Sequence, residues 1–302
     1  MAARLAALVD DAAAVVFLYD RGLYALSAPR LCPPLITVRH EIEEWTSREA
    51  SLAGLSRREG FRMMAARPLV RRLEGRTVRR CDFVAVTSEE EDERMQALYG
   101  RRADILIPAA IRPQPQWKPH DGPPTIGYLG SLDYGPNVDG LHRFVEEGWR
   151  GIPPPTRLIV AGRSPVATVR ALDADGRVEV TDVSEDFDIF FPRFIEQIQV
   201  GVAPLWSGGA GVKVKTLTML GAGIPAVLTP AAGQGLPVVD GVHCLIAEDP
   251  GDFARAVVRL LEDRSFAAEL GAAGRELVNQ SFTWPVVGPR FAQLVGQRVA
   301  QA

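Results

Sequence analysis

Short runs of apolar, β-branched residues alternate along the chain with longer segments of helical periodicity. This alternation is typical of β–α–β units that build a parallel sheet. In the first third it predicts strands at residues 14–19, 35–38, 82–87 and 104–107, and an arginine-rich helix over residues 47–80. Farther along, it predicts strands at residues 125–129, 157–161, 178–181, 198–203, 226–229 and 243–247, and helices at residues 137–149, 212–220, 252–261, 266–279 and 285–299. The pattern therefore indicates an α/β fold with two Rossmann-like domains.

A proline-rich segment separates the two sets of strands. Residues 113–124 (PQPQWKPHDGPP) hold five prolines and show no apolar period. Such a stretch is typical of a linker between domains. We therefore expect a first domain over residues 1–112 and a second domain that begins at residue 125.

Composition and charge narrow the class of protein. At 302 residues, 47% hydrophobic and 24% charged, the chain is ordinary for a globular protein, and its net charge of −3 gives no reason to expect a nucleic-acid partner. The cysteines at positions 32, 81 and 244 form no CxxC pair and have no metal-ligand spacing, so we expect free thiols in a reducing compartment. No apolar run approaches the roughly 20 residues of a membrane span, and the N-terminus lacks a signal-peptide pattern. We expect a cytoplasmic protein.

The segment over residues 203–236 carries the strongest functional signal. A strand ends at Pro204, and Gly208, Gly209 and Gly211 allow the backbone to approach a ligand closely before a helix begins. Unpaired N–H groups and the positive end of the helix dipole then face the same point. This combination predicts an anion-binding turn, although the spacing is not that of a Walker A loop.

Two lysines, Lys213 and Lys215, stand in the first turn of that helix. Cations at a helix N-terminus oppose the dipole and cost up to about 1 kcal/mol each when exposed. An anion bound there would offset this cost, and a diphosphate is the obvious candidate. The competing interpretation is that both lysines are solvated surface residues beside an ordinary loop.

Weaker signals follow other strands and a first-domain helix. Residues 126–141 lead from a strand through Gly127 and Gly130 into a helix near Pro136. Arg163 and Val183 follow two later strands, where ordinary turns explain these two residues as well as contact with a nucleotide does. His40 follows a strand beside two glutamates, where a general base is one interpretation and a helix cap with surface carboxylates the favoured one. The arginines of residues 71–80 suggest contact with anionic lipid heads. A solvated helix face is favoured there, because Glu74 interrupts the cluster.

Together these segments resemble the group 1 glycosyl transferases, which have the GT-B fold and transfer sugars from nucleotide donors with retention. The motifs that carry the resemblance are GYLGSLDYGPNVDGL, GGAGVKVKTLTMLGAGIPAVLTPAAGQGL and DGVHCLIAEDPGDFARAVVRLL. The similarity runs from about residue 14 to the C-terminus and is best over residues 125–260. It implies an acceptor-side domain over residues 1–112, a linker over 113–124, a donor-binding domain over 125–283, and a C-terminal helix over 284–302 that crosses back to the first domain.

The resemblance also implies roles for single residues. It places Lys213 and Lys215 on the donor diphosphate as the catalytic cations. The other donor-site residues that it implies are Gly130, Ser131 and Asn137 beside the phosphates, Arg163 and Val183 near the nucleoside, Gly209, Ala210 and Gly211 under the sugar, and Thr218 at the ribose position. His40 is the acceptor-side candidate. Such enzymes need no metal or cofactor, because cationic side chains and helix dipoles stabilise the departing diphosphate.

The chain departs from the family pattern in two ways. Thr218 stands where the family usually has a glutamate that grips the ribose. Only about 112 residues precede the linker, whereas a full domain of this type needs roughly 150. We therefore expect a first domain that lacks its opening βαβ unit.

Several functions stay open at the level of sequence. The leading hypothesis is a retaining glycosyltransferase of the hexosyltransferase type, with a nucleotide-sugar donor and a glycan, lipid or small natural product as acceptor. Weak peripheral contact with a membrane is a further candidate. The alternatives are a non-catalytic sugar-nucleotide-binding or partner protein and a GT-B-type sugar-nucleotide epimerase. A nicotinamide oxidoreductase is least favoured, because the third glycine of GxGxxG is missing.

Overall fold

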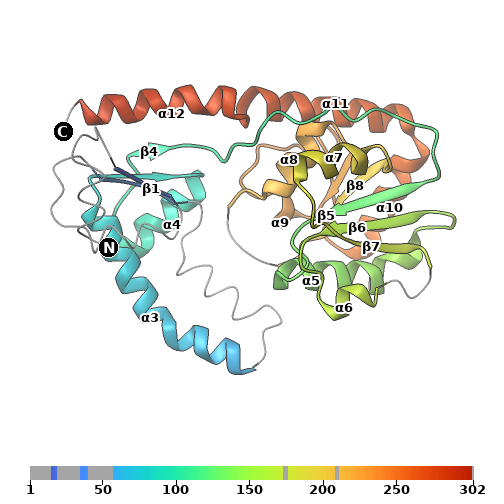
Figure 1. Ribbon diagram of the computed structural model, residues 1–302, viewed down its shortest axis with the longest axis horizontal. Helices are drawn as coiled ribbons and strands as arrows, with labels where there is room; N and C mark the ends of the chain where they lie inside the picture. Colours follow the sequence, from blue (N-terminus) through green and yellow to red (C-terminus); the bar gives the residue numbers. More distant parts are fainter. Residues whose placement is uncertain (1–14, 19–34, 40–56, 173–175, 208–210, 301–302) are drawn as a thin grey trace. The chain divides into compact units, whose positions relative to one another are not determined.

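The computed structural model describes residues 15–18, 35–39, 57–172, 176–207 and 211–300. The chain divides into two compact units (Figure 1). Unit 1 consists of Met1–Ala110, Gly209–Gly211 and Trp284–Ala302, and unit 2 consists of Ile111–Gly208 and Val212–Thr283. Each unit carries its own parallel sheet, so the α/β fold class is confirmed.

Unit 1 is built on a parallel sheet in the order β1-β2-β3-β4. Its described strands are β1 (Val15–Leu18), β2 (Leu35–Arg39), β3 (Phe83–Val86) and β4 (Ile105–Leu106). Its described helices are α3 (Arg57–Arg80), α4 (Glu89–Tyr99) and α12 (Trp284–Val299). The four predicted strands are confirmed to within a few residues, whereas α4 was not predicted.

The last helix of the chain covers the sheet of unit 1. Val287 of α12 is buried with Val38, Ile105 and Ile107, and Phe291 packs against the same cluster. The C-terminal helix therefore contributes to the core of the unit in which the chain begins.

Unit 2 is built on a parallel sheet in the order β10-β9-β8-β5-β6-β7. Its strands are β5 (Thr125–Leu129), β6 (Arg157–Gly162), β7 (Val178–Asp182), β8 (Val200–Ala203), β9 (Ala226–Leu228) and β10 (Leu245–Ile246). Its helices are α5 (Gly135–Arg143), α6 (Ala167–Arg170), α7 (Phe187–Ile195), α8 (Val214–Ala222), α9 (Pro230–Gly233), α10 (Pro250–Glu262) and α11 (Arg264–Ser281). After α5 the chain continues as a π-helical turn (Phe144–Gly148) and a 3-10 turn (Trp149–Gly151).

The centre of this sheet is apolar because helices cover both of its faces. All residues of β5 are buried. Phe144 packs edge-on against Trp149 and Phe253 at the centre of the main core cluster. The strands that position the loops described below are therefore anchored in a rigid core.

The proline-rich segment over residues 113–124 is grouped with unit 2. Trp117 is buried, and its indole Nε1 donates to the Ile198 carbonyl at 2.8 Å. The segment is thus fixed to unit 2 by an aromatic anchor in the middle of its prolines.

The strand order of unit 2 fixes where a ligand can bind. From β5 the chain adds β6 and β7 on one side, and β8, β9 and β10 then extend the sheet on the other side. The order therefore reverses between β5 and β8. In open α/β sheets, ligands bind outside the carboxyl ends of the strands at such a switch point.

Candidate functional site

Two segments lead away from the carboxyl ends of the neighbouring strands β5 and β8. One runs from β5 through the turn at Gly130 and Ser131 into α5, and the other runs from β8 into α8. Asn137 lies in the first turn of α5, and Lys215 lies in the first turn of α8. The switch point therefore brings together residues about 80 positions apart in the sequence.

The amino group of Lys215 lies between a side-chain amide and a phenol. Its Nζ donates to Asn137 Oδ1 at 2.7 Å and to the Tyr128 hydroxyl at 3.1 Å. It also lies 4.7 Å from the centre of the Tyr128 ring, within range of a cation–π interaction. Within the described part of the chain, no carboxylate forms an ion pair with this amine.

Burial changes the chemistry of this lysine. The residue keeps some exposed surface, but its amino group is desolvated, and this burial together with the charge of Lys213 lowers the pKa of Lys215 to about 7. Burial also raises the pKa of Tyr128, so that the phenol stays neutral and serves as an acceptor for the amine. A buried amine without a carboxylate partner gains from a bound anion, because the anion would stabilise its charged form.

Asn137 connects the lysine with the glycine turn. Its Nδ2 donates to the Ser131 carbonyl at 2.8 Å while its Oδ1 accepts from Lys215. Both ends of the amide are therefore engaged and its orientation is fixed. Gly130 leaves room for this arrangement, because a Cβ at that position would lie 2.6 Å from the Tyr128 hydroxyl and 3.2 Å from Asn137 Nδ2.

The start of α8 adds a positive helix end to the site. The N-cap residue, Lys213, has an extended backbone and makes no side-chain capping bond. Lysine has no acceptor atom with which to cap a helix. The preceding Gly211 has a φ of 94°, in the left-handed region that favours glycine. An anion held by Lys213 and Lys215 would thus also meet the positive end of the helix dipole.

The turn after β6 packs directly on the turn after β5. The Arg163 carbonyl accepts from the Leu132 amide at 2.9 Å, and the Val183 amide donates to the Gly162 carbonyl at 2.9 Å. A Cβ at Gly162 would lie 1.7 Å from the Gly130 carbonyl oxygen. Arg163 is exposed and Val183 is buried, and both adjoin the edge of the sheet at which Gly130 lies.

Thr218, which replaces the glutamate expected from the resemblance, is turned toward its own helix. Its hydroxyl donates to the Val214 carbonyl at 2.9 Å, one turn earlier in α8. This bond and the burial of the residue leave no charged group at the position. His40, Gly209 and Ala210 lie outside the described residues. Tyr128 was not predicted as a site residue, because an aromatic residue inside a buried strand is normally part of the core.

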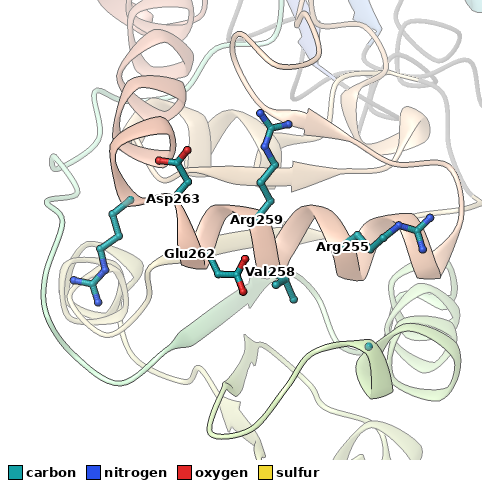
Figure 2. A pocket seen from close by; sticks show the side chains of 7 residues that line it. Arg255, Val258, Arg259, Glu262 and Asp263 are labelled. Atoms are coloured by element: carbon teal, nitrogen blue, oxygen red, sulfur yellow. The ribbon is translucent and has the colours of Figure 1, made fainter.

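A hollow elsewhere in unit 2 lacks the converging positive groups of the site around Lys215. One open hollow of about 500 Å³ lies along α10 and is lined by Gly151, Arg255, Val258, Arg259, Glu262, Asp263 and Arg264. Figure 2 shows that the labelled charged side chains extend in different directions and do not converge. Arg255 and Arg264 form ion pairs with Asp252 and Asp121. Within the described ranges, no group of three or more His, Cys, Asp or Glu residues could hold a metal ion, and no helix is long and apolar enough to cross a membrane.

Comparison with protein families gives one match, and it lies almost entirely within unit 2. Residues 123–263 match the family model described as "Glycosyl transferases group 1". No curated protein matches the chain at a significant level. The match covers β5 to α10 and includes Gly130, Asn137 and Lys215.

Solved structures with the same fold extend over nearly the whole chain. Sucrose-phosphate synthase from Thermosynechococcus elongatus has a TM-score of 0.75 at 18% identity, covering 99% of this chain and 77% of its own. Anabaena HepE in complex with UDP has a TM-score of 0.75 at 14% identity, covering 98% and 82%. The pneumococcal O-GlcNAc transferase GtfA, in complex with UDP and GlcNAc, has a TM-score of 0.61 at 15% identity, covering 93% and 59%. At these identities the likeness shows the GT-B fold.

Proposed function

We propose, because residues 123–263 match the family model of the group 1 glycosyl transferases, that unit 2 binds a nucleotide-diphosphate sugar and that the protein transfers its sugar to an acceptor. The observation that carries this proposal is the amine of Lys215, held at the switch point of the sheet without a carboxylate partner among the described residues. A diphosphate supplies the missing negative charge. Lys213 and the start of α8 provide further positive charge for it.

The choice of lysine supports a chemical role for the pair. The sequence contains three lysines against 31 arginines, and two of the three lysines are Lys213 and Lys215. Arginine stays charged under all ordinary conditions, whereas a buried lysine can lose and regain its proton. A compact ammonium also fits as a point charge against phosphate oxygens. A chain that otherwise uses arginine thus keeps lysine where a tunable amine contacts the ligand.

The transfer step creates negative charge on the leaving group. The bond between the anomeric carbon and the diphosphate oxygen breaks, and its electron pair stays on the phosphate. The acceptor hydroxyl oxygen forms the new bond to the anomeric carbon on the same face of the sugar and gives its proton to the departing phosphate. The anomeric carbon therefore retains its configuration. Lys213, Lys215 and the helix dipole stabilise this developing charge without a metal ion.

The remaining donor contacts follow from the same placement. In this proposal Gly130 and Ser131 lie beside the phosphates, and Asn137 holds Lys215 in position. The nucleoside contacts are assigned to Arg163 and Val183, and the sugar contacts to Gly209, Ala210 and Gly211. His40 is the acceptor-side candidate.

The nucleoside and the acceptor are proposed at the level of class. HepE and GtfA were solved in complex with UDP, so uridine nucleotides are the first donors to test. A hexose is the proposed sugar, and a glycan, a lipid or a small natural product is the proposed acceptor.

A second candidate function is a sugar-nucleotide-binding protein without catalytic activity. Thr218 favours it, because its hydroxyl is bonded to the Val214 carbonyl and leaves the ribose without a charged partner. Binding without turnover would then be the observed behaviour.

Calorimetric titration with UDP-, GDP- and dTDP-sugars tests the donor site. We expect one of these donors to bind the wild type and to lose at least tenfold in affinity, about 1.4 kcal/mol, in the variant with Lys213→Ala and Lys215→Ala. Lys118→Ala is the matched control, because Lys118 is exposed and is the remaining lysine of the chain. No binding of any donor would reject both candidate functions.

Turnover separates the two candidates. The wild type is incubated with the bound donor and a cell extract that supplies acceptors, and free nucleoside diphosphate is measured. Release that depends on both the extract and the two lysines supports the transferase. Donor binding without release over many extracts supports the binding protein.

A further inference from the structure

Figure 1 shows the long helix α3 (Arg57–Arg80) of unit 1. The buried and the exposed residues of this helix form two chemically different faces. Glu74, Thr77 and Val78 are fully buried on one side. On the opposite side Leu69, Arg72, Arg76 and Arg79 are exposed. These positions are spaced three or four residues apart, so they form one stripe along the helix.

The buried position of Glu74 corrects the sequence-based interpretation of this helix. Glu74 was expected to interrupt the arginine cluster and to leave an ordinary solvated face. Its carboxylate instead points into unit 1, where it accepts a hydrogen bond from the Tyr99 hydroxyl. Glu74 therefore does not neutralise the outer face, and the reason for regarding that face as ordinary is removed.

The arginines of this stripe differ from other exposed arginines of the chain. Arg143, Arg157 and Arg193 form ion pairs with Glu147, Glu179 and Glu185. In the part of the chain that the structure describes, no carboxylate pairs with Arg72, Arg76 or Arg79. A local positive face thus stands on a chain whose net charge is −3.

We propose that the face formed by Leu69, Arg72, Arg76 and Arg79 binds the surface of a membrane that contains anionic lipids. From position 69 to 79 the stripe extends for about 15 Å at 1.5 Å per residue. Its charges lie in a row and do not converge on one point, which suits an extended anionic surface better than a small anion. Leu69, with 59% of its surface exposed, is an apolar group that can enter the interface between headgroups and acyl chains.

This inference does not depend on the proposed transferase activity. An arginine near an anionic membrane surface strengthens binding by about fivefold. Three such residues together give about a hundredfold, and this effect weakens as salt screens the charges. A helix that lies on the surface needs no membrane-spanning segment.

Cosedimentation of the full-length chain with lipid vesicles tests the proposal. The vesicles contain either phosphatidylcholine alone or phosphatidylcholine with about one third phosphatidylglycerol, the second type giving a negative surface. We expect binding to the anionic vesicles, weak binding to the neutral ones, and loss of binding at 1 M salt. The variant R72E/R76E/R79E should bind the anionic vesicles at least about a hundredfold more weakly, because it removes three positive charges and adds three negative ones.

Three controls keep the result specific. R72K/R76K/R79K keeps the charges and should keep the binding, because a lipid surface responds to point charges. R143E/R157E/R193E makes the same change in net charge on unit 2 and should also keep it. Leu69→Ser, which leaves every charge in place, should weaken binding by a few fold, and circular dichroism confirms that each variant is folded.

Clear outcomes would overturn the proposal. Failure of the wild type to bind anionic vesicles at low salt is one. Equal binding to neutral vesicles, or equal loss in both triple-glutamate variants, is another. Binding to a soluble polyanion such as dextran sulfate in the absence of vesicle binding would assign the face to a different partner.

Discussion

The amine of Lys215 costs stability wherever it must carry a charge without an anion nearby. Asn137 and Tyr128 offer it two acceptor oxygens, but no negative charge. Functional groups of this kind are retained although they lower stability, because a bound ligand supplies the negative charge that the folded protein lacks. Two predictions at this scale follow from the same group of atoms.

The stability of the wild type should rise with pH relative to that of Lys215→Met. The pKa of Lys215 is about 7 in the folded chain, whereas a lysine in the unfolded chain has a pKa near 10.4. Between these values the unfolded state binds more protons, so the free energy of unfolding increases as pH rises from 7 toward 10. Urea unfolding at pH 6, 7, 8 and 9 measures the difference between the two proteins. Parallel curves over this range would contradict the lowered pKa.

A negative charge introduced at position 137 should weaken donor binding more than loss of the Asn137 side chain does. Asn137→Asp places a carboxylate beside the Lys215 amine, which neutralises it and competes with the donor diphosphate. We expect a loss of roughly tenfold or more in donor affinity, greater than the loss in Asn137→Ala. Calorimetric titration measures both. If Asn137→Asp binds the donor as tightly as the wild type, the amine does not contact the diphosphate.

At the scale of elements, glycines mark where one segment lies against another. Gly140 of α5 and Gly288 of α12 are both helical, but their surroundings differ. A Cβ at Gly140 would lie 1.9 Å from the Pro204 carbonyl oxygen, whereas one at Gly288 would meet no atom of the described residues within 4 Å. Gly140 thus holds α5 against the segment that follows β8, where the site is formed.

Replacing each glycine with alanine should change stability in opposite directions. Gly140→Ala should destabilise the chain by about 1–3 kcal/mol, because the backbone of residue 204 has to move. Gly288→Ala should stabilise it by up to about 1 kcal/mol, because alanine favours a helix. Thermal unfolding compares the two directly. A destabilised Gly288→Ala or a neutral Gly140→Ala would be inconsistent with the packing described.

The strands could be predicted from sequence better than some of the helices. Buried parallel strands leave β-branched runs, and the range predicted for β5 agrees with the strand at both ends. Helix α4 was missed because its charged sequence lacks an apolar stripe, although Ser88 and Glu91 form the start of a capping motif, with the Ser88 hydroxyl accepting from the Glu91 amide. Helix α7 was missed because its phenylalanines and Pro192 conceal a helical period.

The sequence predicted an anion-binding loop before α8, but it did not predict the side-chain partners of Lys215. Glycines and lysines after a strand indicate an anion-binding site from local sequence alone. The contacts of Lys215 with Asn137 and Tyr128 depend on the pairing of β5 with β8. Nothing near Lys215 in the sequence specifies that pairing.

At the scale of the whole molecule, each unit has a core of its own, and α12 brings the end of the chain into the core of unit 1. Val287 is 2% exposed in that core, and its neighbour Val286 is 43% exposed. The two valines thus form a matched pair for testing whether α12 supports unit 1.

Val287→Asp should destabilise unit 1 by about 3 kcal/mol or more, because it buries a charge. Val286→Asp should change stability by less than about 0.5 kcal/mol. At urea concentrations that unfold unit 1 alone, unit 2 should still bind the donor. Nucleotide titration at those urea concentrations measures this binding. Equal effects of the two substitutions would show that α12 does not pack as described.

The most direct test of the account is the dissociation constant of the best-bound nucleotide sugar, measured from pH 6 to 9. The diphosphate diester of a nucleotide sugar does not titrate in this range, so a change in affinity reports the protein. We predict that the affinity of the wild type falls as pH rises above 7, approaching tenfold per unit as Lys215 loses its proton in the free protein. In Lys215→Arg the fall should vanish, because the guanidinium stays charged. A constant affinity across this range in the wild type, or the same fall in both proteins, would contradict the claim that this amine holds the diphosphate.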